Sequence, residues 1–358
     1  MISQLMRNII WISMIILHKK TMKEYKEIDI MKKFSGIHHI TAITSDAYKI
    51  YRFFNDILGL RLVKKTVNQD DINTYHLFFS DAIGQAGTDM TFFDFNGIQK
   101  ATRGTDELSI SGFRVKDDQS LEYYQKRFDY YDVKHGPIET LFGRKMMFFE
   151  DFDGQRYALF SDQTTTESFN GVPFDKSSVP NEYQIVGLGP VFITVSRFDY
   201  FKQVLTEGLF MTYVSSESNM HLFEMGEGGN GASLIIIEDS SKIRGMQGYG
   251  AIHHIAFRVK DQTELNEWID YMNQIGAGNS GFVDRFYFQS LYTRLYPNVL
   301  FEFATDGPGF VDEQESLELL GTTLALPPKF VNRRQEIEKK VRPLDTSDVI
   351  LTKEKEYF

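Results

Sequence analysis

The segments IHHITAIT (37–44) and IHHIAFRV (252–259) decide the fold of this chain. Both are short and rich in β-branched residues, which favours strands. After the first segment, apolar side chains recur at helical spacing over 48–58, and Gly59 ends the predicted helix. Strand-like runs follow at 61–67, 74–79 and 89–95. The predicted order of this first unit is therefore β-α-β-β-β.

The same order recurs three more times. Further units begin with strands at 108–115, 190–196 and 252–259, spaced by roughly 60 to 80 residues, and such regular spacing indicates internal repeats. Their helices are predicted at 121–131, 200–206 and 265–272. Their later strands are predicted at 145–150 and 157–160, at 220–223 and 233–238, and at 286–295 and 299–304. We predict an α+β fold of four βαβββ modules.

The composition divides the 358 residues into parts. The segment 161–182 is polar and holds two prolines, which indicates a linker. We therefore expect an N-terminal domain at 34–160, a C-terminal domain at 183–312 and a tail at 313–358. A charged helix is expected at 332–342 in the tail. Residues 1–30 are expected to be a leader outside the folded domains.

The leader has alternative interpretations. The apolar run 9–17 is shorter than the ~20 residues that a membrane-spanning helix needs. It also lacks the small-residue cleavage site of a signal peptide. We expect translation to start at Met31, with a membrane anchor or signal peptide as the alternatives.

Composition also excludes several functions. The chain has no cysteine, which excludes disulfides, thiolate metal sites, iron–sulfur clusters and cysteine nucleophiles. Absence of cysteine fits a reducing compartment, and we expect a cytoplasmic protein. The net charge of −10 disfavours nucleic acid and anionic membranes as partners.

Four of the eight histidines form two matched adjacent pairs, His38-His39 and His253-His254. Neighbouring strand residues point to opposite faces, so one histidine of each pair should face a given site. In the fourth module the face of Ala251, His253, Ile255, Phe257 and Val259 is the more apolar and should meet the helix. His254 should then face the cavity, and by repeat equivalence so should His39. The alternative is a duplicated core histidine.

Glu302 completes a possible metal site. In the strand 299–304, Val299, Phe301 and Phe303 form the helix side, which leaves Glu302 on the inward face. Two imidazoles and one carboxylate with open positions form the facial triad of non-haem Fe(II) oxygenases. Mn(II) suits the same ligands, and Zn(II) would imply Lewis-acid chemistry. The alternative for Glu302 is an exposed salt bridge. Either Tyr75 or His76 must point inward, in a structural or pocket-lining role.

Modules two and three lack an equivalent set. Ile110 and Gly112 stand near the histidine positions of the second module, and Phe192 and Ile193 stand near those of the third. The sequence therefore predicts one metal per chain, in a cavity where module one meets module four.

Five motifs carry a resemblance to a known family: GIHHIT (36–41), YHLFFSDAIGQAGTDMTFF (75–93), AIHHIAF (251–257), DRFYFQSLYTR (284–294) and NVLFEFATD (298–306). The chain resembles the hydroquinone-type ring-cleaving dioxygenases of bacteria, within the vicinal oxygen chelate superfamily. The resemblance implies modules paired into two domains, each a curved mixed sheet around a cavity. It implies the metal ligands His39, His254 and Glu302. His38, His253, Arg285 and Tyr292 match positions that orient ligands and move protons.

The resemblance implies an Fe(II)-dependent, extradiol-type dioxygenase that acts on a hydroquinone or catechol with O2. Tyr292 or a histidine would supply a proton, and Arg285 would hold an anionic phenolate or carboxylate. Tyr75 and His76 are the candidates for the substrate pocket. A glyoxalase-type metal-dependent isomerase or lyase and a non-catalytic small-molecule binding protein are the alternatives. The expected partners are a small aromatic substrate and O2, with a homo-oligomer left open.

Overall fold

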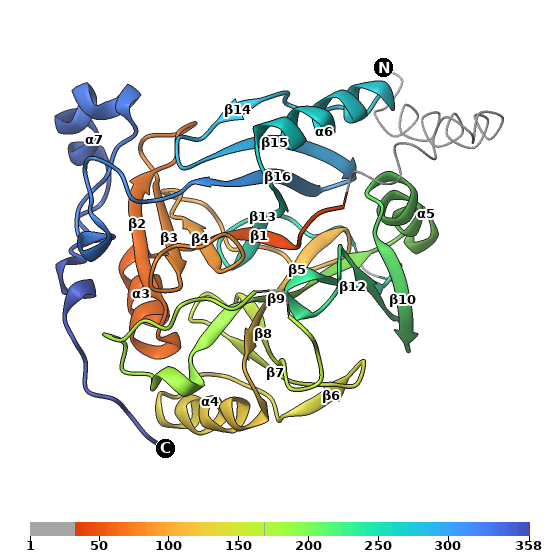
Figure 1. The fold of residues 1–358 in the computed structure, drawn as a ribbon, viewed down its shortest axis with the longest axis horizontal. Coiled ribbons are helices and arrows are strands. Elements are labelled where there is room, and N and C mark those ends of the chain that lie inside the picture. The colour runs from red at the N-terminus through yellow and green to blue at the C-terminus, as the bar shows by residue number, and fades with distance from the viewer. Residues whose placement is uncertain (1–32, 168, 242) are drawn as a thin grey trace.

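The computed structural model describes residues 33–167, 169–241 and 243–358 (Figure 1). The leader expected at 1–30 lies outside these residues. None of the described helices is long and apolar enough to cross a membrane.

The first module has the predicted order. It consists of β1 (Ile37–Ile43), α3 (Ala47–Arg52) with its π-helical continuation η2 (Phe53–Leu58), β2 (Arg61–Val67), β3 (Tyr75–Ser80) and β4 (Asp89–Phe93). The carboxylate of Asp46 accepts hydrogen bonds from the first backbone N–H groups and so caps α3. Gly59 ends the helix with φ 80°, a left-handed conformation that favours glycine.

The other three modules repeat this order. The second comprises β5 (Glu107–Val115), α4 (Asp118–Tyr130), β6 (Glu139–Leu141), β7 (Arg144–Glu150) and β8 (Arg156–Ser161). The third comprises β9 (Ile185–Val195), α5 (Phe198–Gln203), η4 (Val204–Gly208), β10 (Thr212–Glu217), β11 (Met220–Glu224) and β12 (Ser233–Glu238). The fourth comprises β13 (Ala251–Val259), α6 (Gln262–Gln274), β14 (Val283–Asp284), β15 (Phe288–Tyr296) and β16 (Val299–Pro308).

The sequence did not predict the strands β6, β10 and β14. Each lies at the edge of a sheet. Five of the six residues of β10 are exposed, and β14 has two residues. Edge strands of this kind carry no regular apolar alternation, which is the signal that the prediction used.

The modules form two eight-stranded mixed sheets, as the α+β prediction requires (Figure 1). The first has the order β14-β15-β16-β13-β1-β4-β3-β2, and the second has the order β10-β11-β12-β9-β5-β8-β7-β6. Each sheet therefore joins one module from before the expected linker with one from after it. The expectation that 34–160 and 183–312 each form a separate sheet is corrected: modules one and four share a sheet, and modules two and three share the other.

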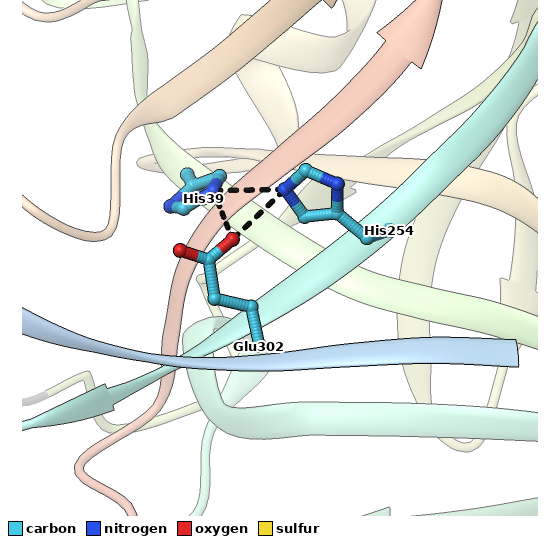
Figure 2. Close-up of side chains that lie close together, drawn as sticks. All are labelled: His39, His254 and Glu302. Carbon is cyan, nitrogen blue, oxygen red and sulfur yellow. Dashed lines mark hydrogen bonds and ion pairs between the residues drawn. The ribbon is translucent and has the colours of Figure 1, made fainter. Parts of the chain in front are cut away.

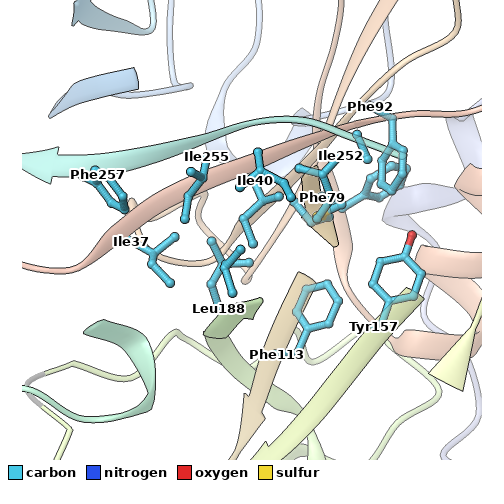
Figure 3. Packing of buried hydrophobic residues seen from close by; sticks show 14 of the residues in the cluster. Ile37, Ile40, Phe79, Phe92, Phe113, Tyr157, Leu188, Ile252, Ile255 and Phe257 are labelled. Carbon is cyan, nitrogen blue, oxygen red and sulfur yellow. The ribbon is translucent and has the colours of Figure 1, made fainter. Parts of the chain in front are cut away.

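In each sheet two modules meet at a seam, which is the contact between their first strands. The first strands of two modules pair antiparallel, β1 with β13 and β5 with β9. One face of each sheet contributes to a large shared core, where Ile40 and Ile255 of the first sheet approach Phe113 and Leu188 of the second (Figure 3). The opposite face of the first sheet carries a separate apolar cluster that includes Phe78 and Phe288.

The tail holds the first sheet and the second module together. Leu320 packs on the smaller apolar cluster, and the buried Lys64 Nζ of β2 lies 2.8 Å from Glu315 Oε2. The tail then passes α7 (Arg334–Lys340), the expected charged helix, and ends beside α4 (Figure 1). There Glu356 Oε2 accepts a 2.6 Å hydrogen bond from the buried Arg127.

Candidate active site

Two β-bulges place the histidine pairs. In the antiparallel pairing of β1 with β13, Ile37 opposes Phe257 and His39 opposes Ala256, so His38 is an extra residue. Further along, Thr41 opposes His254 and Ala42 opposes Ile252, so His253 is the extra residue of the other strand. A bulge interrupts the alternation of side chains.

The bulges correct the expected facing of the fourth module. Ile252, not His253, joins Ile255 in the shared core, and His253 lines the cavity together with His254. The strict alternation that we assumed is therefore wrong at His253. Alternation also fails at His38, the extra residue of β1. Ile37 and Ile40 both enter the core although they are three residues apart, which a regular strand does not allow.

His39, His254 and Glu302 converge on one point (Figure 2). Glu302 Oε2 lies 3.1 Å from His39 Nε2 and 2.9 Å from His254 Nε2, and the two nitrogens are 3.2 Å apart. The three residues are 1%, 4% and 0% exposed. Ser290 Oγ donates a 2.5 Å hydrogen bond to Glu302 Oε1, which leaves Oε2 directed at the two histidines.

The hydrogen bonds of His38 fix the tautomer of His39. His38 Nε2 lies 2.9 Å from the carbonyl oxygen of Thr305, so this nitrogen carries the proton and donates it. Burial, reinforced by His39, lowers the pKa of His38 to about 3, so the ring is neutral and its Nδ1 accepts. His39 Nδ1, 3.0 Å away, must then donate. In the neutral tautomer that this contact selects, His39 Nε2 carries no proton and can bind a metal ion.

The second pair is arranged in the same way. His253 Nδ1 lies 2.7 Å from His254 Nδ1, and burial lowers the pKa of His253 to about 3. When His254 donates from Nδ1 to His253, its Nε2 is free of a proton. Thr41 Oγ1 lies 2.9 Å from this Nε2, and a chain of hydrogen bonds continues through Thr91 Oγ1 to His76 Nε2.

This donor set suits a cation. Burial alone would raise the pKa of Glu302, but His39 and His254 beside it lower that pKa well below its usual value. Burial also lowers the pKa of His254, against the opposing effect of Glu302. Two imidazole nitrogens and a carboxylate oxygen therefore meet within 3.2 Å of one another. A proton or a metal ion between them satisfies such a buried set.

A cavity of about 440 Å³ opens beside the three groups. Its wall is largely aromatic: Phe78, Phe93, Phe95, Tyr287 and Phe288 line it. The ring of His76 packs between those of Phe78 and Phe93, with centroids 4.0 and 4.4 Å away. Burial lowers the pKa of His76 well below its usual value, so the ring is neutral. Such a cavity can enclose a flat aromatic molecule.

Arg285 and Tyr292 form one part of this wall. Arg285 Nε donates a 3.0 Å hydrogen bond to Tyr292 Oη. Burial and the nearby Glu302 raise the pKa of Tyr292, so its hydroxyl keeps its proton. The oxygen accepts from Arg285, and the hydroxyl hydrogen is directed toward Glu302, one of the three converging groups.

The structure brings together most of the residues singled out in the sequence. His39, His76, His253, His254, Arg285, Tyr292 and Glu302 line the cavity, and His38 lies behind His39. Tyr75 does not line it. The strand alternation that turns His76 inward sends Tyr75 into the core, where its hydroxyl donates to the carbonyl oxygen of Arg342. The expectation of a pocket role for Tyr75 is therefore corrected.

Sequence reasoning missed several polar residues of the site. Thr41 stands two residues after His39 on the same strand, so alternation could have found it. Thr91 and Ser290 come from strands whose register with β1 and β16 the sequence does not give. Asp70 and Gln69 lie on a loop, where no periodicity operates.

The described residues hold one cluster of His, Asp or Glu side chains able to bind a metal ion, which is His39, His254 and Glu302. At the corresponding face of the second sheet, Ile110 and Phe192 belong to an apolar cluster. One metal per chain stays a prediction, for which the described residues offer one candidate centre.

The two sheets of paired βαβββ modules define the vicinal oxygen chelate fold. Glyoxalase I of Zea mays shares this fold, with a TM-score of 0.53 at 13% identity over 76% of this chain and 92% of that one. A crystal structure of a Bacillus subtilis protein described as a dioxygenase superposes with a TM-score of 0.79 at 31% identity, over 88% of this chain and 98% of that one. No family model matches the chain.

The relatives specify the family. MhqA of Bacillus subtilis, which its name assigns to the ring-cleaving dioxygenases, is 41% identical over 317 residues, 87% of this chain and 99% of its own length. The chlorohydroquinone/hydroquinone 1,2-dioxygenase of Sphingobium indicum is 28% identical over 321 residues, 87% of this chain and 97% of its own length. The chain belongs to the ring-cleaving dioxygenases of the vicinal oxygen chelate superfamily. It is therefore a ring-cleaving dioxygenase of a metal-dependent family, rather than the isomerase or the binding protein left as alternatives.

Proposed function

We propose that this enzyme uses Fe(II), held by His39, His254 and Glu302, to cleave the ring of a hydroquinone or a catechol with O2. The observation that carries the choice of metal is the donor set, because two histidine nitrogens and one carboxylate oxygen lie within 3.2 Å of one another. Two histidines and one carboxylate with open positions are the ligand set of non-haem Fe(II) oxygenases. Mn(II) suits the same ligands, and the oxygenase chemistry of the family favours a redox-active ion over Zn(II).

When bound, Fe(II) supplies the path by which electron density passes from a deprotonated aromatic diol to O2 at a neighbouring position. The protein residues hold the ring and move protons. The neutral ring of His253 lies in the cavity next to His254, whose Nδ1 proton it accepts, so its own protonated Nε2 can donate a hydrogen bond to a substrate oxygen. The hydroxyl of Tyr292 remains protonated and donates a hydrogen bond toward the reacting oxygen atoms.

The aromatic wall selects the substrate by shape. Phe78, Phe93 and Phe288 exclude water from the cavity and pack against a flat ring. The named activity of the Sphingobium indicum relative supports a hydroquinone. The acidic chain and its lack of cysteine support a small-molecule partner rather than nucleic acid, and a cytoplasmic location.

The test is anaerobic loading of the full chain with Fe(II), Mn(II) or Zn(II), followed by an oxygen-electrode screen of hydroquinones and catechols. We expect one O2 consumed per diol with Fe(II), both oxygen atoms of ¹⁸O2 in the ring-opened product, and no turnover by Glu302→Gln. Fe(II) loading without O2 uptake on any diol would overturn the proposal.

A further inference from the structure

The cavity contains one cationic side chain, and that cation is already paired. Among its described lining residues, Arg285 carries a positive charge, and Asp70, Asp71 and Glu302 carry negative charges. Arg285 Nη2 lies 3.0 Å from Asp70 Oδ2. The Asp70 side chain is 73% exposed, which places this pair at the mouth of the cavity, whereas Glu302 lies at its buried end.

The loop of Asp70 is held in place. Asn68 Oδ1 accepts from the Asp70 N–H, and Asp71 Oδ2 accepts from Thr74 Oγ1. Gln69 Nε2 donates a 2.6 Å hydrogen bond to the carbonyl oxygen of Arg285, which ties this loop of module one to module four. Asp70 is thus fixed opposite Arg285, unlike an isolated surface ion pair with freely moving partners.

The pairing changes what Arg285 can bind. Its Nε donates to Tyr292 and its Nη2 donates to Asp70. A free guanidinium offers two parallel N–H donors to a carboxylate, but here the Nη2 donor is already bound to a carboxylate of the protein itself. A second anion entering beside Arg285 would meet the negative charge of Asp70 at close range.

We propose that Asp70 is a specificity-determining residue that admits uncharged diphenols and rejects rings bearing a carboxylate. The inference rests on the proposed function and concerns the substituents that the site accepts. It differs from the carboxylate part of the expectation that Arg285 holds an anionic phenolate or carboxylate of the substrate.

The test separates binding from turnover. Titration calorimetry without oxygen compares 4-hydroxybenzoate with its uncharged analogue 4-hydroxybenzamide on the Fe(II)-loaded full chain. We expect the wild type to favour the amide and Asp70→Asn to shift the ratio of affinities toward the benzoate by about tenfold, the scale of one like-charge contact in a partly buried site. The same substitution should raise kcat/KM for 2,5-dihydroxybenzoate relative to hydroquinone.

Asp270→Asn is the matched control, because it removes one charge from an exposed position of α6 that does not line the cavity. It should leave the affinity ratio near that of the wild type, and 0.5 M NaCl should weaken the wild-type discrimination by screening. An unchanged ratio in Asp70→Asn, or an equal change in Asp270→Asn, would overturn the inference. Absence of O2 uptake with every diphenol would instead count against the proposed function and would leave the binding ratios interpretable.

Discussion

His38 Nδ1 lies 3.0 Å from Nδ1 of its sequence neighbour His39, although adjacent residues of a regular strand point to opposite faces. The bulge in β1 makes this contact possible, and the bulge in β13 does the same for His253 and His254 at 2.7 Å. Each bulge therefore places a second imidazole behind a metal-binding one. Backbone irregularity here serves the orientation of the site.

The first prediction tests that role. His38→Phe keeps a planar ring but removes both nitrogens, so His39 Nδ1 loses its acceptor and its tautomer is no longer fixed. We expect metal affinity to fall by about 10- to 100-fold, as for other residues that orient a ligand. Competition with a chelator of known affinity measures it. His221→Phe, a substitution on β11 in the second sheet, should leave the affinity unchanged.

The second prediction concerns stability with and without metal. Without metal, His39 and His254 stabilise the ionised carboxylate of Glu302 and keep its pKa low, and Glu302→Gln removes that interaction, so this variant should unfold at a lower temperature than the wild type. With Mn(II) at 100 times its Kd, the wild type should gain about 2.7 kcal/mol of stability. The variant should gain almost nothing. Calorimetry of the four samples would contradict the ligand assignment if metal stabilised both proteins equally.

The residues show what the sequence could and could not predict. Helical periodicity and β-branched runs located the four modules, because those signals lie within a few neighbouring residues. The convergence of His39, His254 and Glu302 followed from side-chain alternation, which holds at those three positions. It failed at His38 and His253, since a bulge depends on how two distant strands pair.

The sequence also could not predict which modules pair in a sheet. The first strands of all four modules look alike, so nothing local decides whether β1 pairs with β13 or β5. The polar members of the site show the same limit: Thr91 meets Thr41 only because β4 runs parallel to β1 in a particular register. Side-chain periodicity can be read from one strand, whereas register depends on how two strands pair.

The third prediction uses a carboxyl group away from the cavity. Burial raises the pKa of Asp151 to about 7, with a smaller contribution from Asp153, while its pKa in the unfolded chain is near 3.8. Between pH 4 and 7 the folded state holds a proton that the unfolded state lacks. This group therefore makes stability fall as pH rises, by at most about 1.4 kcal/mol per pH unit.

Asp151→Asn removes that proton uptake while keeping the oxygen that accepts from the backbone N–H groups of Asp153 and Gln155. The stability of the variant relative to the wild type should increase from pH 4 to pH 7 and level off above it. Urea unfolding at each pH measures the difference. A difference independent of pH would show that Asp151 is ionised throughout.

The last prediction follows from the shared sheet. His39 lies on β1 and precedes the segment 161–182, whereas His254 and Glu302 lie on β13 and β16 and follow it. The halves 31–165 and 183–358 therefore each carry an incomplete ligand set, and each exposes the edge of a seam strand that is paired in the full chain. We expect each half alone to bind Fe(II) at least 100-fold more weakly than the full chain and to show no turnover, because loss of a ligand costs at least as much as loss of an orienting residue.

Coexpression of the two halves should restore Fe(II) binding and turnover, because the seams β1–β13 and β5–β9 can then form between chains. The coexpression experiment distinguishes loss of a metal ligand from failure of a half to fold. Full metal affinity in the C-terminal half alone would show that His39 is not a ligand.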